Sequence, residues 1–380
     1  MPHLLREYAK NLGVKISKPI VSNHFFPIEF DNYITISIDD ENQSKSYKNY
    51  DIVFFILKPF LKKHDIKVVQ ISGKSQISGV DKFLNIPFKQ QAYVISNGLL
   101  HFGVDGALNH LSSLRKKPTV TLFGNIYANT NKPLFSSSSL NINLEPDWDK
   151  NPCFSNVDPK QQINNIKPEK IAQSIINLLK KEKAKVNFKT IYQGSAFNQT
   201  IIEVVPSSFC NIQTSNNQEI FLRVDYGFDQ QAFTEFCKRH KCTIFTDKVI
   251  KAEDLAPLSN NINNIFFFVH PDDDLIPDKY FNDLKSLNIN PVILVNEKEH
   301  LSAVRNKYFD LVVKHYNGNS KKPEQVTSKS RFLCTKHLIA NGKKYPSYAH
   351  WKNNIDNSDK VIDSADYWKE SEYFYIYEQN

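Results

Sequence analysis

The residues best suited to chemistry lie in one stretch, residues 101–124, which reads HFGVDGALNHLSSLRKKPTVTLFG. A short apolar strand is predicted to end at Val104, and a helix that carries His110 follows a tight turn. Ligands of open α/β sheets bind where strands end and helices begin. Free N–H groups at a helix N-terminus bind phosphate, and Gly106 would let a pyrophosphate approach closely. These residues are compatible with a phosphate site, but by themselves they fit Asp105 as a helix cap and His110 in the core better, since that is the commoner arrangement.

Strands and helices alternate on both sides of this stretch. Residues 128–168 are rich in Ser, Asn and Pro and are predicted to form a loop, and an amphipathic helix over 169–183 follows them. Such alternation predicts a parallel sheet that is covered by helices on both faces. The expected strands are 33–38, 67–71, 99–103 and 119–123, and the expected helices are 50–63, 87–96 and 108–114.

The second half of the chain repeats the alternation and predicts a second α/β unit. A short N-terminal helix is expected to end at Gly13, and residues 317–380 have no clear period. The further expected strands are 201–205, 220–224, 243–245, 265–269, 292–295 and 311–313, with helices at 230–239, 277–287 and 298–308. The expected domains are an N-terminal helix and connector (1–29), a first α/β domain (30–185), a second α/β domain (190–330) and an aromatic-rich C-terminal extension (331–380).

The stretch 101–124 resembles the signature of glycosyltransferase family 9, the heptosyltransferase-type enzymes of lipopolysaccharide synthesis. That signature runs D-[ST]-G-x-x-H-L-A-x-A-x-x-x-P-x-x-x-L-F-G. Upstream, Lys45-Ser46-Tyr47 resembles the family's K-x-W, and the resemblance covers residues 30–185. Gly106 replaces the family's Ser or Thr and Ala107 its Gly, which removes a hydroxyl contact to phosphate. The positions that agree, without a gap, are Asp105, His110, Leu111, Pro118, Leu122, Phe123 and Gly124.

The resemblance implies a GT-B-like α/β architecture with two Rossmann-like lobes, in which residues 30–185 bind a nucleotide-sugar donor. The family places its donor-binding half second, so the resemblance implies either a swapped lobe order, with residues 190–330 as the acceptor lobe, or loss of the acceptor half's chemistry. It also implies a metal-independent, inverting transfer to a glycan or lipid-linked saccharide, with the nucleotide sugar as donor substrate and no other cofactor. The residues that would line the donor site are Lys45, Gly73, Asp105, Gly106, Ala107 and His110.

An inverting transfer needs a general base that accepts the proton of the acceptor hydroxyl. We expect this base in the second half, at the end of a strand. Asp225 follows the strand 220–224, and Asp273 lies in the cluster His270-Pro271-Asp272-Asp273-Asp274 after the strand 265–269. Asp225 is preferred because Gly227 predicts a tight turn, while each aspartate alone would also suit a turn or a helix cap.

Composition and charge limit the class of protein. With 380 residues the chain is long enough for two domains. It contains no apolar run near the roughly 20 residues that span a bilayer, and its start lacks the pattern of a signal peptide. We expect a cytoplasmic protein that could associate peripherally with the inner membrane. The net charge of +8 favours anionic partners, namely nucleotides, sugar phosphates, anionic glycolipid or nucleic acid, and does not choose among them. Nucleic acid is not excluded, but we expect nucleotides ahead of it because the sequence has no zinc-finger spacing and no RNA-binding aromatic signature.

Alternative functions remain on the same fold. The chain could be a catalytically decayed sugar-nucleotide-binding or scaffold protein, a DNA- or protein-modifying glycosyltransferase, or a two-lobed sugar-nucleotide epimerase. Cys237, His240 and Cys242 raise the possibility of a metal site, but their spacing lacks a second cluster and favours unpaired thiols around a packed turn.

Overall fold

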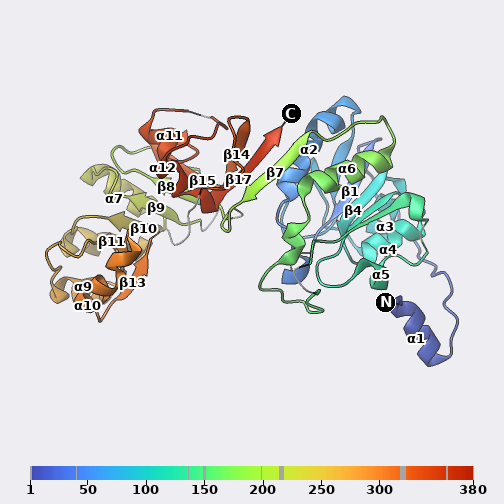
Figure 1. Cartoon of the computed structure of the whole chain (residues 1–380), viewed down its shortest axis with the longest axis horizontal. Helices are drawn as coiled ribbons and strands as arrows, with labels where there is room; N and C mark the ends of the chain where they lie inside the picture. Colours follow the sequence, from blue (N-terminus) through green and yellow to red (C-terminus); the bar gives the residue numbers. More distant parts are fainter. Residues whose placement is uncertain are drawn as a thin grey trace. The chain divides into compact units, whose positions relative to one another are not determined.

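The computed structural model describes residues 2–39, 41–135, 137–148, 151–197, 199–213, 218–316, 322–356 and 358–379. The chain divides into two compact units, unit 1 up to Thr190 and unit 2 from Ile191 to Gln379 (Figure 1). Each unit contains a mainly parallel sheet flanked by helices, which confirms the α/β class predicted from the sequence.

Unit 1 is built on a sheet in which every neighbouring pair of strands is parallel. From β1, the next two strands along the chain, β2 and β3, add to one side of the sheet. The chain then returns past β1, and β4, β5 and β6 add to the other side. The sheet therefore changes winding direction between β1 and β4, and such a switch point is where open α/β sheets bind ligands. The strand order is β3 (Lys82–Phe83), β2 (Lys67–Gln70), β1 (Tyr33–Ser37), β4 (Leu100–Val104), β5 (Thr119–Leu122) and β6 (Asn141–Leu144).

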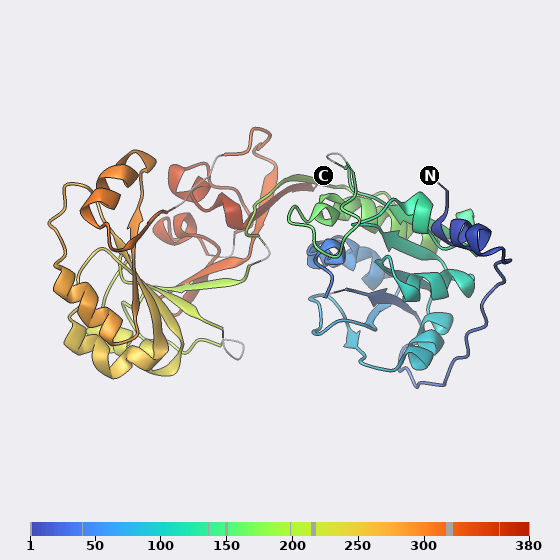
Figure 2. The ribbon, with the colours of Figure 1, turned by 90° about the horizontal axis from the view of Figure 1, so that it is seen from below.

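Helices cover both faces of this sheet (Figures 1 and 2). Ile34 and Phe102 belong to the core beneath α2 (Tyr50–Lys63) and α6 (Pro168–Leu179). Val69 belongs to the core beneath α3 (Phe88–Asn97) and α4 (Ala107–Leu114) on the other face. Because both faces are covered, β1 and β4 are buried along their whole length, including their polar residues Thr35, Ser37 and His101.

Smaller elements complete unit 1. Helix α1 (Leu4–Leu12) ends at Gly13, as predicted, and Gly13 adopts the left-handed conformation that this residue type accepts without strain. The remaining elements are α5 (Ala128–Asn131) and the 3-10 helices η1 (Gln43–Lys45), η2 (Ser138–Leu140) and η3 (Gln162–Asn165).

Unit 2 contains a second sheet, which is parallel except for its edge strand β16, antiparallel to β15. One face packs its apolar side chains beneath α7 (Gln230–Arg239), α9 (Asp278–Ser286) and α10 (Leu301–Lys307). The strand order is β13 (Val312–His315), β12 (Asn290–Val295), β11 (Ile262–Phe268), β10 (Cys242–Thr246), β9 (Ile220–Arg223), β8 (Ile201–Val204), β15 (Lys336–Ala340) and β16 (Lys343–Tyr345).

A small sheet with the order β14 (Ser330–Cys334), β17 (Phe374–Gln379) and β7 (Phe188–Gln193) lies at the end of unit 2, and the division between the units falls within β7. Within the described residues, every helix is too short or too polar to span a lipid bilayer. The remaining elements are α8 (Ala252–Leu255), α11 (Tyr348–Lys352), α12 (Ala365–Trp368), η4 (Ala256–Asn261), η5 (Lys298–His300) and η6 (Ser371–Tyr373).

Two of the differences between the structure and the sequence predictions concern strands of the two large sheets. The predicted loop 128–168 contains β6, whose residues become a strand by pairing with β5. The residues predicted to form a C-terminal extension contribute two strands to one edge of the unit 2 sheet, where β15 pairs with β8 and β16 is the edge strand. The buried positions of β15 are Lys336, Leu338 and Ala340. Because one of the three is a lysine, the sequence lacks the alternation of apolar and polar residues that would otherwise indicate a strand.

Candidate functional site

A cavity of about 400 Å³ lies at the switch point of unit 1, at the carboxyl ends of β1 and β4. Gly73 adopts a positive φ of 106°, and a Cβ at this position would lie 2.4 Å from Ile38 Cδ1, so only glycine fits. The cavity walls come from the end of β1, the turn after β2 and the start of α4. The lining residues are Ser37, Ile38, Asp39, Glu41, Asn42, Ser72, Gly73, Lys74, Val104, Asp105, Gly106, Ala107, Leu108 and Asn109.

The first turn of α4 faces this cavity. Gly106 is the N-cap in extended conformation, and among the described residues no side chain caps the helix. The N–H groups of Asn109 and His110 donate to the Gly106 carbonyl. The N–H groups that precede them in α4 are the first of the helix, and such groups have no acceptor within their own helix. An added Cβ on Gly106 would have Val104 O, at 3.7 Å, as its nearest described neighbour. The backbone of this turn is therefore open to an incoming anion.

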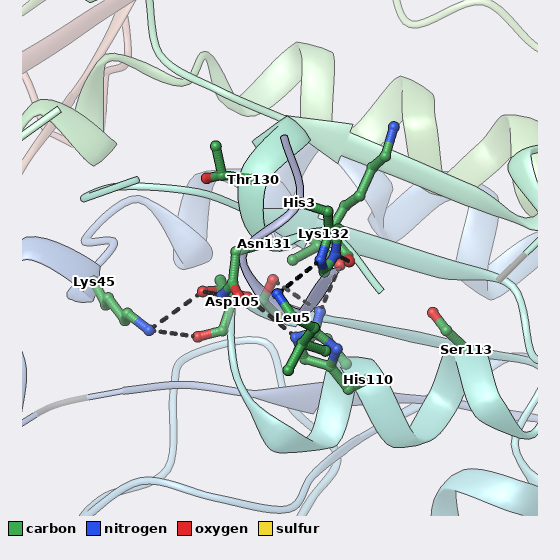
Figure 3. Close-up of polar contacts among 12 residues, drawn as sticks. His3, Leu5, Lys45, Asp105, His110, Ser113, Thr130, Asn131 and Lys132 are labelled. Carbon is green, nitrogen blue, oxygen red and sulfur yellow. Dashed lines mark hydrogen bonds and ion pairs between the residues drawn. The ribbon is translucent and has the colours of Figure 1, made fainter. Parts of the chain in front are cut away.

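Asp105 does not cap α4, because its carboxylate turns toward other partners (Figure 3). Lys45 Nζ, from η1, lies 2.9 Å from Asp105 O and 3.4 Å from Oδ2. Asn131 Nδ2, from α5, donates to Oδ2 at 2.8 Å, and His110 Nε2 lies 3.6 Å from Oδ1. The site thus joins β4, α4, α5 and η1, segments that are up to 86 positions apart in the sequence.

The charge of Asp105 is compensated within this cluster. The side chain is only 3% exposed, and burial by itself would raise its pKa. The His110 imidazole, the Lys45 ammonium and the Asn131 amide outweigh burial and hold the pKa of Asp105 below its ordinary value. Asp105 is therefore ionised at neutral pH, and it anchors a lysine and a histidine beside the open end of α4.

Gly124 determines where Lys45 lies. A Cβ on Gly124 would be 2.1 Å from the backbone oxygen of Ser44 and 2.8 Å from Ile163 Cβ. Only glycine therefore allows η1 to approach the end of β5 this closely. Ser44 is fixed further by its hydroxyl, which donates to Ser155 O at 2.7 Å. Gly124 of the sequence motif thus acts on the site through the segment that carries Lys45.

A buried polar network beneath α4 was missed by sequence reasoning. Asn109 Nδ2 donates to Thr121 Oγ1 at 3.0 Å and to the carbonyls of Gly103 and Val120 at 3.3 Å, which ties α4 to β4 and β5. His101 lies beside it, with Nδ1 2.9 Å from Thr35 Oγ1 and Nε2 3.1 Å from a cavity-lining hydroxyl, that of Ser37. Polar residues within mainly apolar strand sequences were the signal from which this network could have been predicted.

Burial lowers the pKa of His101 to about 3, so its ring is neutral at physiological pH. Gly103 belongs to the same region, because a Cβ there would lie 2.6 Å from Ser37 O. The close approach of β1 and β4 therefore requires glycine at this position. The network holds the cavity floor and the first turn of α4 in fixed register.

Among the predicted donor-site residues, Gly73, Asp105, Gly106 and Ala107 line the cavity, while Lys45 and His110 contact Asp105. The structure therefore brings all of these residues together. Tyr47, which stands at the Trp position of the K-x-W motif, is a core residue whose hydroxyl donates to Ile166 O at 2.9 Å.

The predicted base Asp225 belongs to a buried ionic cluster in unit 2. Arg223 contacts both of its carboxylate oxygens, with Nε 2.9 Å from Oδ1 and Nη2 2.5 Å from Oδ2. Arg223 also contacts Glu203 at 3.1 Å, and Lys336 bridges Glu203 and Glu370 at 2.9 and 2.6 Å. Burial raises the pKa of Asp225, and the contact with Arg223 opposes that rise.

The other predicted base, Asp273, lies in an exposed turn after β11. Its Oδ2 accepts a hydrogen bond from the backbone N–H of His270 at 2.6 Å, and Lys307 contacts its backbone oxygen. Cys237 and Cys242 are buried free thiols, and the hydrogen bond between them, together with burial, raises the pKa of Cys242. In the described part of the chain, no group of three or more His, Cys, Asp or Glu side chains could hold a metal ion.

No family model and no curated protein match this chain. Among solved structures, it is similar to the glycosyl transferase family 9 protein of Veillonella parvula DSM 2008, with a TM-score of 0.34 and 14% identity over 47% of this chain and 50% of that one. It is similar to an E. coli heptosyltransferase solved with ADP (TM-score 0.31, 15% identity, 44% and 53% covered). It is also similar to a UDP-GlcNAc 2-epimerase of Methanocaldococcus jannaschii (0.28, 13%, 41% and 41%). The chain spans about half the length of the solved structures it matches first.

Proposed function

We propose that the chain is a glycosyltransferase, which binds the diphosphate of a nucleotide sugar at the switch-point cavity of unit 1 and transfers the sugar to a hydroxyl of a glycan or lipid-linked saccharide. The observation that carries the proposal is the arrangement of Lys45 and His110 around the ionised Asp105, beside the open N-terminal turn of α4. The motif resemblance places the same residues in a donor site.

The electrostatics of the site suit a diphosphate. Lys45 balances the charge of Asp105, so the carboxylate does not repel an anion as an isolated one would. The partial positive charge of the α4 N-terminus and its free N–H groups then favour the phosphate oxygens. His110, with a side chain one third exposed, adds a ring that can donate a hydrogen bond or carry charge.

The proposed reaction uses these groups to stabilise the leaving group. The bond between the anomeric carbon and the phosphate oxygen breaks, and negative charge develops on the nucleoside diphosphate. Preorganised N–H groups and the nearby cations stabilise that charge without further reorganisation. The acceptor oxygen forms the new bond to the anomeric carbon, and its proton passes to a general base, for which Asp225 and Asp273 remain the predicted residues. Asp225 would first have to leave Arg223, whereas the Asp273 side chain is already exposed.

A protein that binds a sugar nucleotide without transferring the sugar is the second candidate. Two observations favour it: the turn Gly106-Ala107 offers no side-chain hydroxyl to phosphate, and both carboxylate oxygens of Asp225 are held by Arg223. The two candidates share the binding site and differ only in turnover.

Thermal unfolding with ADP, UDP, GDP, CMP and TDP tests the binding site. A nucleotide at about 100 times its dissociation constant stabilises the folded state by about 2.7 kcal/mol, and this raises the melting temperature. We expect one nucleotide to do so in the wild type, and Lys45→Met and His110→Ala to abolish the shift measured against their own ligand-free values. Lys48→Met is the matched control, because Lys48 is an exposed lysine three positions away.

If no nucleotide shifts the melting temperature, or if Lys48→Met and Lys45→Met behave alike, the proposed site is wrong. Turnover then separates the two candidates. Incubation of the matching nucleotide sugar with saccharide acceptors releases nucleoside diphosphate and extends the acceptor if the protein is a transferase. Binding with neither product indicates the non-catalytic candidate.

A further inference from the structure

Helix α1 turns its apolar face to solvent. Leu5, Tyr8 and Leu12 are 42%, 61% and 74% exposed, and their spacing of three and four residues places them on one stripe of the helix. Amphipathic helices of globular proteins normally bury this stripe against the core. Here the exposed stripe is the apolar side of the helix, and Ala9 is its buried residue.

The helix is nevertheless held in place. His3 caps it by accepting a hydrogen bond from Leu5 N, and its Nε2 lies 2.8 Å from Lys132 O at the end of α5 (Figure 3). A free helix of this length would be marginal in water. The contact with α5 therefore keeps a formed helix on unit 1 and leaves its apolar stripe presented outward.

The exposed apolar surface continues beyond the helix and is accompanied by positive charge. Val14, Ile20 and Phe25 are exposed in the connector that follows. Residues 2–25 also contain Arg6, Lys10, Lys15 and Lys18 against Glu7 as the acidic residue, a net charge of 4 − 1 = +3. An apolar stripe flanked by basic residues is the pattern of a helix that lies in the interface of a membrane.

We propose that residues 2–25 attach unit 1 to the surface of an anionic lipid bilayer. Leu5, Tyr8 and Leu12 enter the boundary between headgroups and acyl chains, and the basic side chains contact lipid phosphates. A second copy of the chain is a poorer occupant, because pairing the same segment with itself would bring two surfaces of +3 charge together. The proposal does not depend on the sugar-transfer activity.

Co-flotation of the full chain with vesicles tests this attachment. We expect binding to phosphatidylcholine vesicles that contain phosphatidylglycerol, and binding at least roughly ten-fold weaker to phosphatidylcholine alone or at high salt. The triple variant Leu5→Gln, Tyr8→Gln and Leu12→Gln should bind on the order of 100-fold more weakly, because it removes the apolar contact and keeps the charge. Phe309→Gln is the matched control, since Phe309 is 80% exposed in unit 2.

A second set of substitutions examines the charge. The variant Arg6→Gln, Lys10→Gln, Lys15→Gln and Lys18→Gln should lose the preference for phosphatidylglycerol, and its melting temperature should match that of the wild type. Absence of vesicle binding would overturn the proposal, as would equal binding by the triple variant and Phe309→Gln. A concentration-dependent dimer that the triple variant abolishes would assign the stripe to a second copy and overturn it as well.

Discussion

Replacing Gly124 by alanine should disturb the site through a segment that is distant in the sequence. The new Cβ would meet Ser44 O at 2.1 Å, and ordinary contact begins at 3.4 Å. Ser44 must therefore retreat by about 1.3 Å, because a backbone atom cannot rotate away as a flexible side chain can. Lys45 follows Ser44 in η1, and a shift of this size is enough to take its Nζ, now 2.9 Å from Asp105 O, out of hydrogen-bond range.

The expected cost has two parts. Overpacking of a well-packed region costs about 1–3 kcal/mol. Weakening the contact of Lys45 leaves the buried carboxylate of Asp105 less compensated, which adds to that cost. We expect the free energy of unfolding to fall by roughly 2–4 kcal/mol in Gly124→Ala. A displacement of about 1 Å in a binding group also weakens ligand binding strongly.

Gly106→Ala is the control that matches Gly124→Ala. The nearest described neighbour of its added Cβ would be Val104 O, at an ordinary contact distance of 3.7 Å. Urea unfolding should show a change within about 0.5 kcal/mol for this variant and the larger loss for Gly124→Ala. Both variants should lose the nucleotide-induced rise in melting temperature, Gly106→Ala by filling space beside the helix N-terminus and Gly124→Ala by displacing Lys45. Equal stability of Gly124→Ala and the wild type would refute the reasoning.

Further predictions concern the buried polar groups. Because the folded pKa of His101 is about 3 against an ordinary 6.5, its stabilising effect is complete above pH 6.5 and is lost as the pH falls toward 3. The loss is about 2 kcal/mol by pH 5, and His101→Gln should remove this component from the pH profile of urea unfolding; an unchanged slope would contradict it. Arg223→Met leaves the carboxylate of Asp225 buried without its partner and should cost about 3–5 kcal/mol, whereas the exposed Lys238→Met should cost less than about 0.5, as measured by urea unfolding. Asn109→Ala removes the amide that joins α4 to β4 and β5 and should cost about 2 kcal/mol; a wild-type melting temperature would show that the amide bonds do not hold the turn.

The α/β class could be predicted from the sequence because short runs rich in apolar and β-branched residues indicate strands. The alternation of these runs with helical periodicity follows from local physical requirements and can be read without tertiary information. The stretch 101–124 was identified for the same reason, since a strand end, a glycine turn and a helix start are all local features. The order of the strands, and therefore the switch point between β1 and β4, was not local.

Tertiary structure decided which residues act together. Lys45 meets Asp105 across 60 positions, and Gly124 meets Ser44 across 80, contacts that no spacing along the chain specifies. Asp225 was predicted to be a general base at a strand end, and only the folded unit shows that Arg223 holds its carboxylate. Hydrophobic periodicity reports which face of an element is buried, and it carries no information on which distant segment covers that face. The sequence alone therefore determined the kinds of element and the local turn chemistry, while the partners of each charged side chain followed from packing of the whole unit.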